Sequence, residues 1–138
     1  MKYKFLSHTA DAKFHSYGKT LEESFENSVE ALINIICKEK IKKITKKIIK
    51  SEGKDLEELL YNFLEEFLFL IDSRDFIPSE ILKIKIYKKG EGYKLNSEVI
   101  GDNLKNYKTH TGIKAITYNE MFVIKEKDAY KCQVVVDI

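Results

Sequence analysis

Residues 55–71 read DLEELLYNFLEEFLFLI and form the most apolar segment of the sequence. Their apolar residues recur every three or four positions, which is the spacing of one buried face of an α-helix. Asp55 and Glu58 have the spacing of a capping box, in which side chains accept hydrogen bonds from the free N–H groups at the start of a helix. The pattern predicts a helix at the centre of the fold, against which the other elements pack.

A second helix is expected upstream of this one. Thr20 and Glu23 have the same capping spacing, and a stripe of apolar residues continues from there to about Cys37. The stripe consists of Leu21, Phe25, Val29, Leu32 and Ile36. We identify no clear internal repeat and no linker, and we expect a single domain spanning residues 1–138.

Alternating apolar and polar residues predict strands on both sides of the helices. The expected strands span residues 3–6, 12–17, 44–51, 81–87, 93–100, 115–124 and 130–138. Turns at residues 89–92 and 125–129 would close two hairpins, and residues 72–78 are expected to form a loop. Two helices and several antiparallel strands indicate the α+β class, with both helices packed on one mostly antiparallel β-sheet.

The composition argues against a protein whose main task is to grip nucleic acid. Among 138 residues, 24 are lysine or arginine and 22 are aspartate or glutamate, so the formal net charge is only +2. Arg74 is the only arginine, although arginine is the preferred residue for bidentate contacts with phosphates and bases. Cys37 and Cys132 lack the spacing of a disulfide framework or a zinc site, so we expect two reduced thiols.

No association with a membrane is expected. No stretch approaches the roughly 20 apolar residues of a spanning helix, and the first residues are too polar for a signal peptide. We therefore expect a cytoplasmic protein.

A lysine-rich segment at residues 38–50 has two interpretations. Part of it alternates lysine with isoleucine, as in an edge strand whose lysines discourage pairing with another molecule. The alternative is a patch that docks onto an acidic partner or an RNA backbone.

Three short segments carry residues suited to binding a cation or a phosphate. In the first, a polar turn, His8 and Asp11 could point the same way, although such turn residues often bond the local backbone. The second is the C-terminal pair Asp137 and Ile138, whose side-chain and terminal carboxylates repel each other unless a cation or proton lies between them. The third candidate, Lys114, enters a strand and could contact a phosphate or remain solvated.

The chemistry of these segments is that of hard oxygen ligands, which suit Ca²⁺ or Mg²⁺ rather than zinc. The sequence contains no P-loop and no GxGxxG, CxxC, HExxH or GxSxG motif. Functions based on nucleotide binding, zinc or a serine nucleophile therefore have no support in the sequence.

The order of the three segments resembles the archease family. Its members open with a short strand and a His-Thr-Ala-Asp turn, followed by a helix start of the Gly-Thr-Leu-Glu-Glu type, matched here by residues 8–11 and 18–23. A leucine-rich helix, a Lys-Ala-(Val/Ile)-Thr-Tyr segment and a terminal Asp-Ile follow, matched by residues 59–67, 114–118 and 137–138. The resemblance runs from residue 3 to residue 138.

The resemblance implies a function. Archeases are protein cofactors, not themselves enzymes, of the RtcB-type RNA ligase. That ligase works through a guanylylated histidine and joins RNA ends bearing a 2′,3′-cyclic phosphate or 3′-phosphate to a 5′-hydroxyl, chiefly in tRNA splicing. Archeases promote its guanylylation and multiple turnover. The implied direct partner is the ligase, with RNA (tRNA halves) contacted only indirectly and the oligomeric state left open.

The resemblance also implies a set of site residues. The family binds a divalent metal, calcium in crystals, and the matching ligands are Asp11, Asp137 and the terminal carboxylate of Ile138. Mg²⁺ or Mn²⁺ could take the place of Ca²⁺ in the cell. Lys114 is implied to be required for function, and we add His8 as a second candidate.

Two departures from the family pattern weaken parts of this expectation. Ser7 stands where an acidic residue often precedes the histidine, so weaker metal binding is expected. Asn119 follows the Lys-Ala-Ile-Thr-Tyr segment where many members have histidine, so a role of that histidine does not transfer to this chain.

Two other functions stay open at this point. One is a stand-alone metal-dependent phosphohydrolase that uses His8, Asp11 and Asp137. The other is a nucleic-acid-binding chaperone module that uses the lysines of residues 38–50.

Overall fold

The structure is a computed structural model, and it describes residues 1–6 and 11–138. Within these residues the elements follow one another in the order β1, β2, α1, β3, α2, β4, β5, η1, β6 and β7. Their bounds are β1 Tyr3–Leu6, β2 Ala12–Gly18, α1 Leu21–Ile36, β3 Thr45–Gly53, α2 Leu56–Arg74, β4 Phe76–Lys89, β5 Gly92–Asn103, the 3₁₀ helix η1 Leu104–Asn106, β6 Ala115–Glu126 and β7 Ala129–Asp137.

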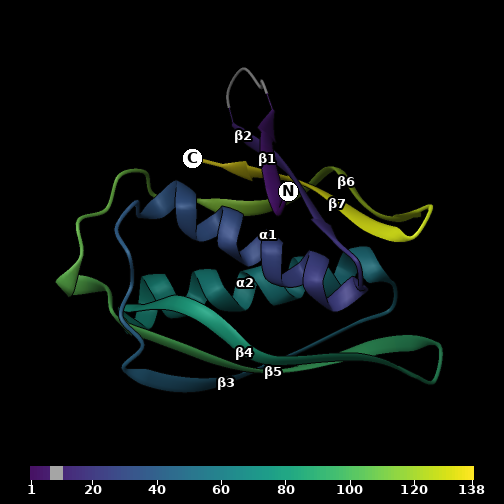
Figure 1. The fold of residues 1–138 in the computed structure, drawn as a ribbon, viewed down its shortest axis with the longest axis horizontal. Coiled ribbons are helices and arrows are strands. Elements are labelled where there is room, and N and C mark those ends of the chain that lie inside the picture. Colours follow the sequence, from purple (N-terminus) through teal and green to yellow (C-terminus); the bar gives the residue numbers. More distant parts are fainter. Residues whose placement is uncertain (7–10) are drawn as a thin grey trace.

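The strands form two separate antiparallel sheets with both helices between them (Figure 1). Sheet A has the strand order β1-β2-β7-β6, and sheet B has the order β3-β5-β4. Helix α1 contacts β2 of sheet A and β4 of sheet B, whereas α2 contacts β3 of sheet B and β6 of sheet A. Each helix therefore touches both sheets, and the core lies in the helical layer.

The predicted α+β class is confirmed, together with both helices and both hairpins, but the strands divide between two sheets where one was expected. The strand expected at residues 44–51 is β3, an edge strand of sheet B. The loop expected at residues 72–78 is wrong, since α2 continues to Arg74 and β4 begins at Phe76. One residue suffices to join them because Asp75 adopts a left-handed conformation with φ 50°, which ends the helix abruptly.

The core is built on the buried face of α2. Phe63 and Phe67 of α2 and Phe25 of α1 are completely buried, with ring centroids 6.2 Å apart for Phe25 and Phe63 and 5.0 Å apart for Phe63 and Phe67. Burial of one such side chain stabilises a fold by about 1.5–3 kcal/mol. The cysteines Cys37 and Cys132 are buried and free. In the described part of the chain, no helix combines the length and the apolar character needed to cross a membrane.

Both strand-to-helix junctions are built in the same way. Residues 18–23 read GKTLEE, and residues 53–58 read GKDLEE. The N-cap side chain of each copy accepts a hydrogen bond from the backbone N–H three residues on, at 3.0 Å for Thr20 and 2.8 Å for Asp55. In each copy a glutamate side chain also accepts one from the N–H of the lysine before the cap, at 3.1 Å. The two predicted capping boxes are confirmed, and the shared pattern is limited to these six residues at each junction.

Each copy also links its helix to the opposite sheet. Glu22, in the first turn of α1, accepts a hydrogen bond from the N–H of Ile86 in β4 at 3.1 Å. The equivalent Glu57 of α2 accepts one from the N–H of Val123 in β6 at 3.2 Å. Helix α1 follows a strand of sheet A and α2 follows a strand of sheet B, so the two glutamates join the halves of the fold reciprocally.

The junctions leave no room for a side chain on their glycines. A β-carbon on Gly18 would lie 2.4 Å from the backbone nitrogen of Ser24, and one on Gly53 would lie 2.4 Å from that of Leu59. We therefore predict that Gly18→Ala and Gly53→Ala each lower the free energy of unfolding, measured by urea denaturation, by about 2 kcal/mol or more. Gly112→Ala is the control, since nothing lies within 4 Å of its added carbon. Its effect should stay below about 1 kcal/mol, and equal effects at all three positions would contradict the steric argument.

Candidate functional site

The described candidate residues lie at one end of sheet A. There β7 pairs with β2 on one side, up to Ala12, and with β6 on the other, up to Ala115. Asp11 immediately precedes β2, Lys114 immediately precedes β6, and Asp137 is the last residue of β7. The fold therefore brings together three residues that are far apart in the sequence.

Lys114 is bonded directly to the C-terminal segment. Its backbone N–H donates to the carbonyl oxygen of Asp137 at 2.8 Å. Asp137 is partly buried, whereas Lys114 and Ile138 are exposed. Strand alternation places Asp137 with Val135 on the face of sheet A that turns away from the helices. The C-terminus lies at this end of the sheet (Figure 1).

The donor atoms fit a hard divalent cation. Asp11 and Asp137 supply carboxylate side chains at the same strand end, and the terminal carboxylate of Ile138 adds a third oxygen group. Within residues 1–6 and 11–138, no three His, Cys, Asp or Glu side chains gather closely enough to hold a metal. His8 lies outside the described residues.

A hydrogen-bonded network covers the face of sheet A next to these residues. His15 Nε2 lies 2.7 Å from Oε1 of Gln133, and Gln133 Nε2 donates to the carbonyl oxygen of Glu120 at 2.6 Å. Glu120 sits in a bulge of β6 with φ 55°, and its side chain pairs with Lys13 at 3.3 Å. Beside this network Val135 is completely buried, although it points away from the helices. The sequence pattern did not reveal the network, because the alternation of β6 gave no sign of the bulge.

An aromatic contact holds the segment that follows Lys114. The ring of Tyr118 in β6 stacks on that of Tyr61 in α2, with centroids 4.0 Å apart and planes inclined by 9°. Desolvation raises the pKa of Tyr118 above its ordinary value, and the nearby carboxylate of Glu58 adds to the shift. The segment is therefore fixed at both ends, through its backbone bond to β7 and through this stack.

The chain as a whole matches one protein family. The family model described as "Archease protein family (MTH1598/TM1083)" matches residues 3–138. The chain belongs to the archease family. It is 39% identical to the protein archease of Methanosarcina barkeri, over 99% of this chain and 96% of that protein. It is 37% identical to that of Pyrococcus abyssi, over 99% of both. The resemblance inferred from the sequence is confirmed.

Solved structures of the archease family share the fold. The solution structure of protein 1598 of Methanobacterium thermoautotrophicum superimposes with a TM-score of 0.85 at 29% identity, covering 99% of this chain and 98% of that one. The crystal structure of an archease from Thermotoga maritima gives a TM-score of 0.62 at 23% identity, covering 98% and 96%. The arrangement of two helices and antiparallel sheets is therefore common to these chains over nearly their full length.

We predict that the stack of Tyr61 on Tyr118 couples β6 to α2. In a double-mutant cycle of Tyr61→Ala and Tyr118→Ala, the coupling in unfolding free energy should be about 0.5–1.5 kcal/mol. A control cycle pairs Tyr61→Ala with Tyr87→Ala, because Tyr87 lies on β4, and should show additive effects. Additive effects in the stacked pair as well would mean that the contact does not hold the segment.

Proposed function

We propose that this protein is a non-catalytic cofactor of an RtcB-type RNA ligase, which promotes guanylylation and multiple turnover of the ligase in tRNA splicing. The observation that carries this proposal is the grouping of Asp11, Lys114 and Asp137 at one accessible end of sheet A. Membership of the archease family supports it, since the family match covers all three residues.

The side chains of the proposed site suit binding rather than covalent catalysis. Its described groups are carboxylates and an amine, and none of them forms a pair of nucleophile and adjacent base. We therefore assign the nucleophile to the ligase. The part that remains for this site is to position a cation or the phosphates of a nucleotide at the ligase.

In this proposal a divalent cation is held by Asp11, Asp137 and the terminal carboxylate of Ile138. Ca²⁺, Mg²⁺ and Mn²⁺ all accept such oxygen ligands. When bound, the cation supplies positive charge that polarises phosphate oxygens. The carboxylates would otherwise repel one another, so they favour a cation between them. Lys114 acts as a point charge toward a phosphate oxygen.

Removal of these charges should abolish ligase activation without unfolding the protein. Lys114 is exposed and Asp137 is partly exposed, so Lys114→Ala and Asp137→Ala should change the melting temperature little. The rate of GMP loading onto a purified cognate ligase, followed with labelled GTP, should fall by about tenfold or more toward the rate of the ligase alone. Asp128→Ala, at an exposed position in the turn between β6 and β7, is the matched control and should activate like the wild type.

Two results would contradict the cofactor proposal. One is unchanged GMP loading when the wild-type protein is added in substoichiometric amounts to the cognate ligase. The other is hydrolysis of a nucleotide or phosphoester by the protein alone, lost in Asp11→Ala, which would indicate a phosphohydrolase.

The terminal carboxylate of Ile138 allows a separate prediction. Adding a few residues after Ile138 moves that carboxylate away, while β7 itself ends at Asp137 and should fold as before. The extended protein should keep its melting temperature without metal, but it should lose the increase produced by Ca²⁺, which at 100 times the Kd corresponds to about 2.7 kcal/mol. The same residues added before the exposed Met1 serve as the control. An extended protein that responds to Ca²⁺ and activates the ligase like the wild type would exclude the α-carboxylate from the site.

A further inference from the structure

The outer face of sheet B is not covered by either helix. Both helices pack on its inner face, where Leu95 and Val99 of β5 are completely buried (Figure 1). Asn96, which follows Leu95, is exposed, and its side chain points to the outer face because side chains alternate along a strand. Lys50 of β3 and Lys85 of β4 both lie opposite Asn96 in the antiparallel register, so their side chains share this outer face. The sheet thus joins lysines from two distant parts of the sequence.

Most of the positive charge on this face is not neutralised. Lys46 pairs with Glu98 at 3.4 Å, and Lys94 pairs with Glu52 at 3.6 Å. Other exposed lysines of the face make no ion pair with any residue that the structure describes, and we call them the lysine face. They are Lys50, Lys83, Lys85 and Lys89.

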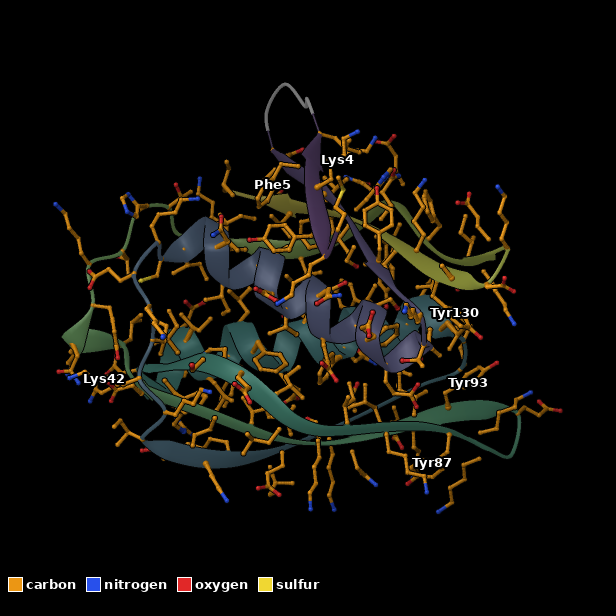
Figure 2. All side chains as sticks on the ribbon, viewed as in Figure 1. Lys4, Phe5, Lys42, Tyr87, Tyr93 and Tyr130 are labelled. Atoms are coloured by element: carbon orange, nitrogen blue, oxygen red, sulfur yellow. The ribbon has the colours of Figure 1, made fainter. Side chains whose placement is uncertain are left out.

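Strand β4 carries most of the lysine face as a regular row. Lys83, Lys85, Tyr87 and Lys89 occupy every second position of this edge strand, so neighbouring members lie about 6.7 Å apart along it. Tyr87 is partly exposed within the row, and its hydroxyl accepts a hydrogen bond from Asn96 Nδ2 at 3.4 Å. Figure 2 shows Tyr87 and many nitrogen-tipped side chains on the side of sheet B that turns away from the helices. The row combines three positive charges with one aromatic ring.

We propose that the lysine face binds the sugar–phosphate backbone of a single-stranded nucleic acid, without preference for sequence, and that Tyr87 stacks on one base. A row of lysines without acidic partners matches a polymer with one negative charge per nucleotide, and a partly exposed aromatic ring accepts any base. Lysine contacts phosphate as a point charge, and the bidentate arginine forks that read bases do not occur on this face.

Other acidic partners fit this face less well. Protein–protein interfaces are depleted of lysine and enriched in arginine and large aromatic residues. Basic surfaces that bind membranes insert Trp, Phe or Leu beside the charges. The chain has no tryptophan, and its exposed phenylalanines, Phe5 and Phe69, lie on β1 and α2. The large apolar side chains exposed on the strands of sheet B are Ile48 of β3 and Leu82 of β4, which lie on opposite edge strands and form no continuous apolar stripe.

The lysine face and the carboxylate site lie on opposite sides of the molecule. Sheet A and sheet B are separated by the helical layer, and the lysine face turns away from it (Figure 1). A ligase held at the end of sheet A would therefore leave the lysine face open. The inference stands apart from the proposed function, and it departs from the expectation that RNA is contacted only indirectly.

Binding to a labelled single-stranded RNA of 20 nucleotides and mixed sequence, measured by fluorescence anisotropy, tests the inference. Four phosphate contacts to a single strand predict an affinity about 50-fold lower at 200 mM than at 50 mM salt. Replacing Lys50, Lys83, Lys85 and Lys89 together by Gln should remove about 3 from the slope of log K against log salt and weaken binding about tenfold or more at 50 mM. Tyr87→Ala should weaken binding about fivefold or more and leave the slope unchanged.

The matched control replaces four exposed lysines outside the lysine face by Gln, which changes the net charge equally. They are Lys19, Lys108, Lys125 and Lys127. This variant should bind RNA like the wild type, and the lysine-face variant should still activate the ligase. Equal losses of RNA affinity in the two variants would mean that only the net charge matters, and this would overturn the proposal. Undetectable RNA binding at 50 mM salt, or tighter binding to phosphatidylserine vesicles than to RNA through the same lysines, would overturn it too.

Discussion

The fold depends on the close contact between the start of each helix and the strand before it. At Gly18 and Gly53 the backbone of the strand lies so near the helical backbone that only glycine fits. The capping boxes satisfy the free N–H groups of the same turns, which have no partner within the helix. From each of these turns a glutamate reaches a strand of the other sheet, through Glu22 on one side and Glu57 on the other. The hydrogen bonds of these two glutamates therefore form only when both sheets are in place.

The carboxylate site depends on this arrangement through the register of sheet A. The junction fixes β2 at Gly18, which lies opposite Tyr130, and the ladder runs without interruption to the pair of Ala12 and Val136. That register brings Asp137 to the level of Asp11. A shift by one residue would turn the apolar face of β7 toward solvent, because side chains alternate between the faces of a strand. Burial of the valines of β7 thus selects the register that assembles the site.

Local signals in the sequence predicted much of the fold, and long-range pairing accounts for what they missed. Capping boxes and helical stripes act within a few residues, so both helices could be recognised from short windows. The alternation of a strand does not identify its partner, which is why one sheet was expected where two exist. The likeness of the two strand-to-helix junctions is confined to six residues in each, and the helices differ afterwards. The positive φ angles of Asp75 and Glu120 belong to non-glycine residues and left no mark in the pattern.

The candidate sites differ in the same way: one is built from residues in short sequence motifs, and the other from residues that only strand pairing brings together. Asp11, Lys114 and Asp137 could be predicted as site residues because they stand in short motifs, whereas the lysine face is built by pairing β3 and β4 to β5 and has no motif of its own. The formal charge of +2 argued against nucleic acid because it averages over the whole surface. Charges act over a Debye length of about 10 Å at 0.1 M salt, and the helical layer alone is about 10 Å thick. The nucleic acid proposed to bind at sheet B would therefore respond to the surplus lysines of that face, and not to the carboxylates at the end of sheet A.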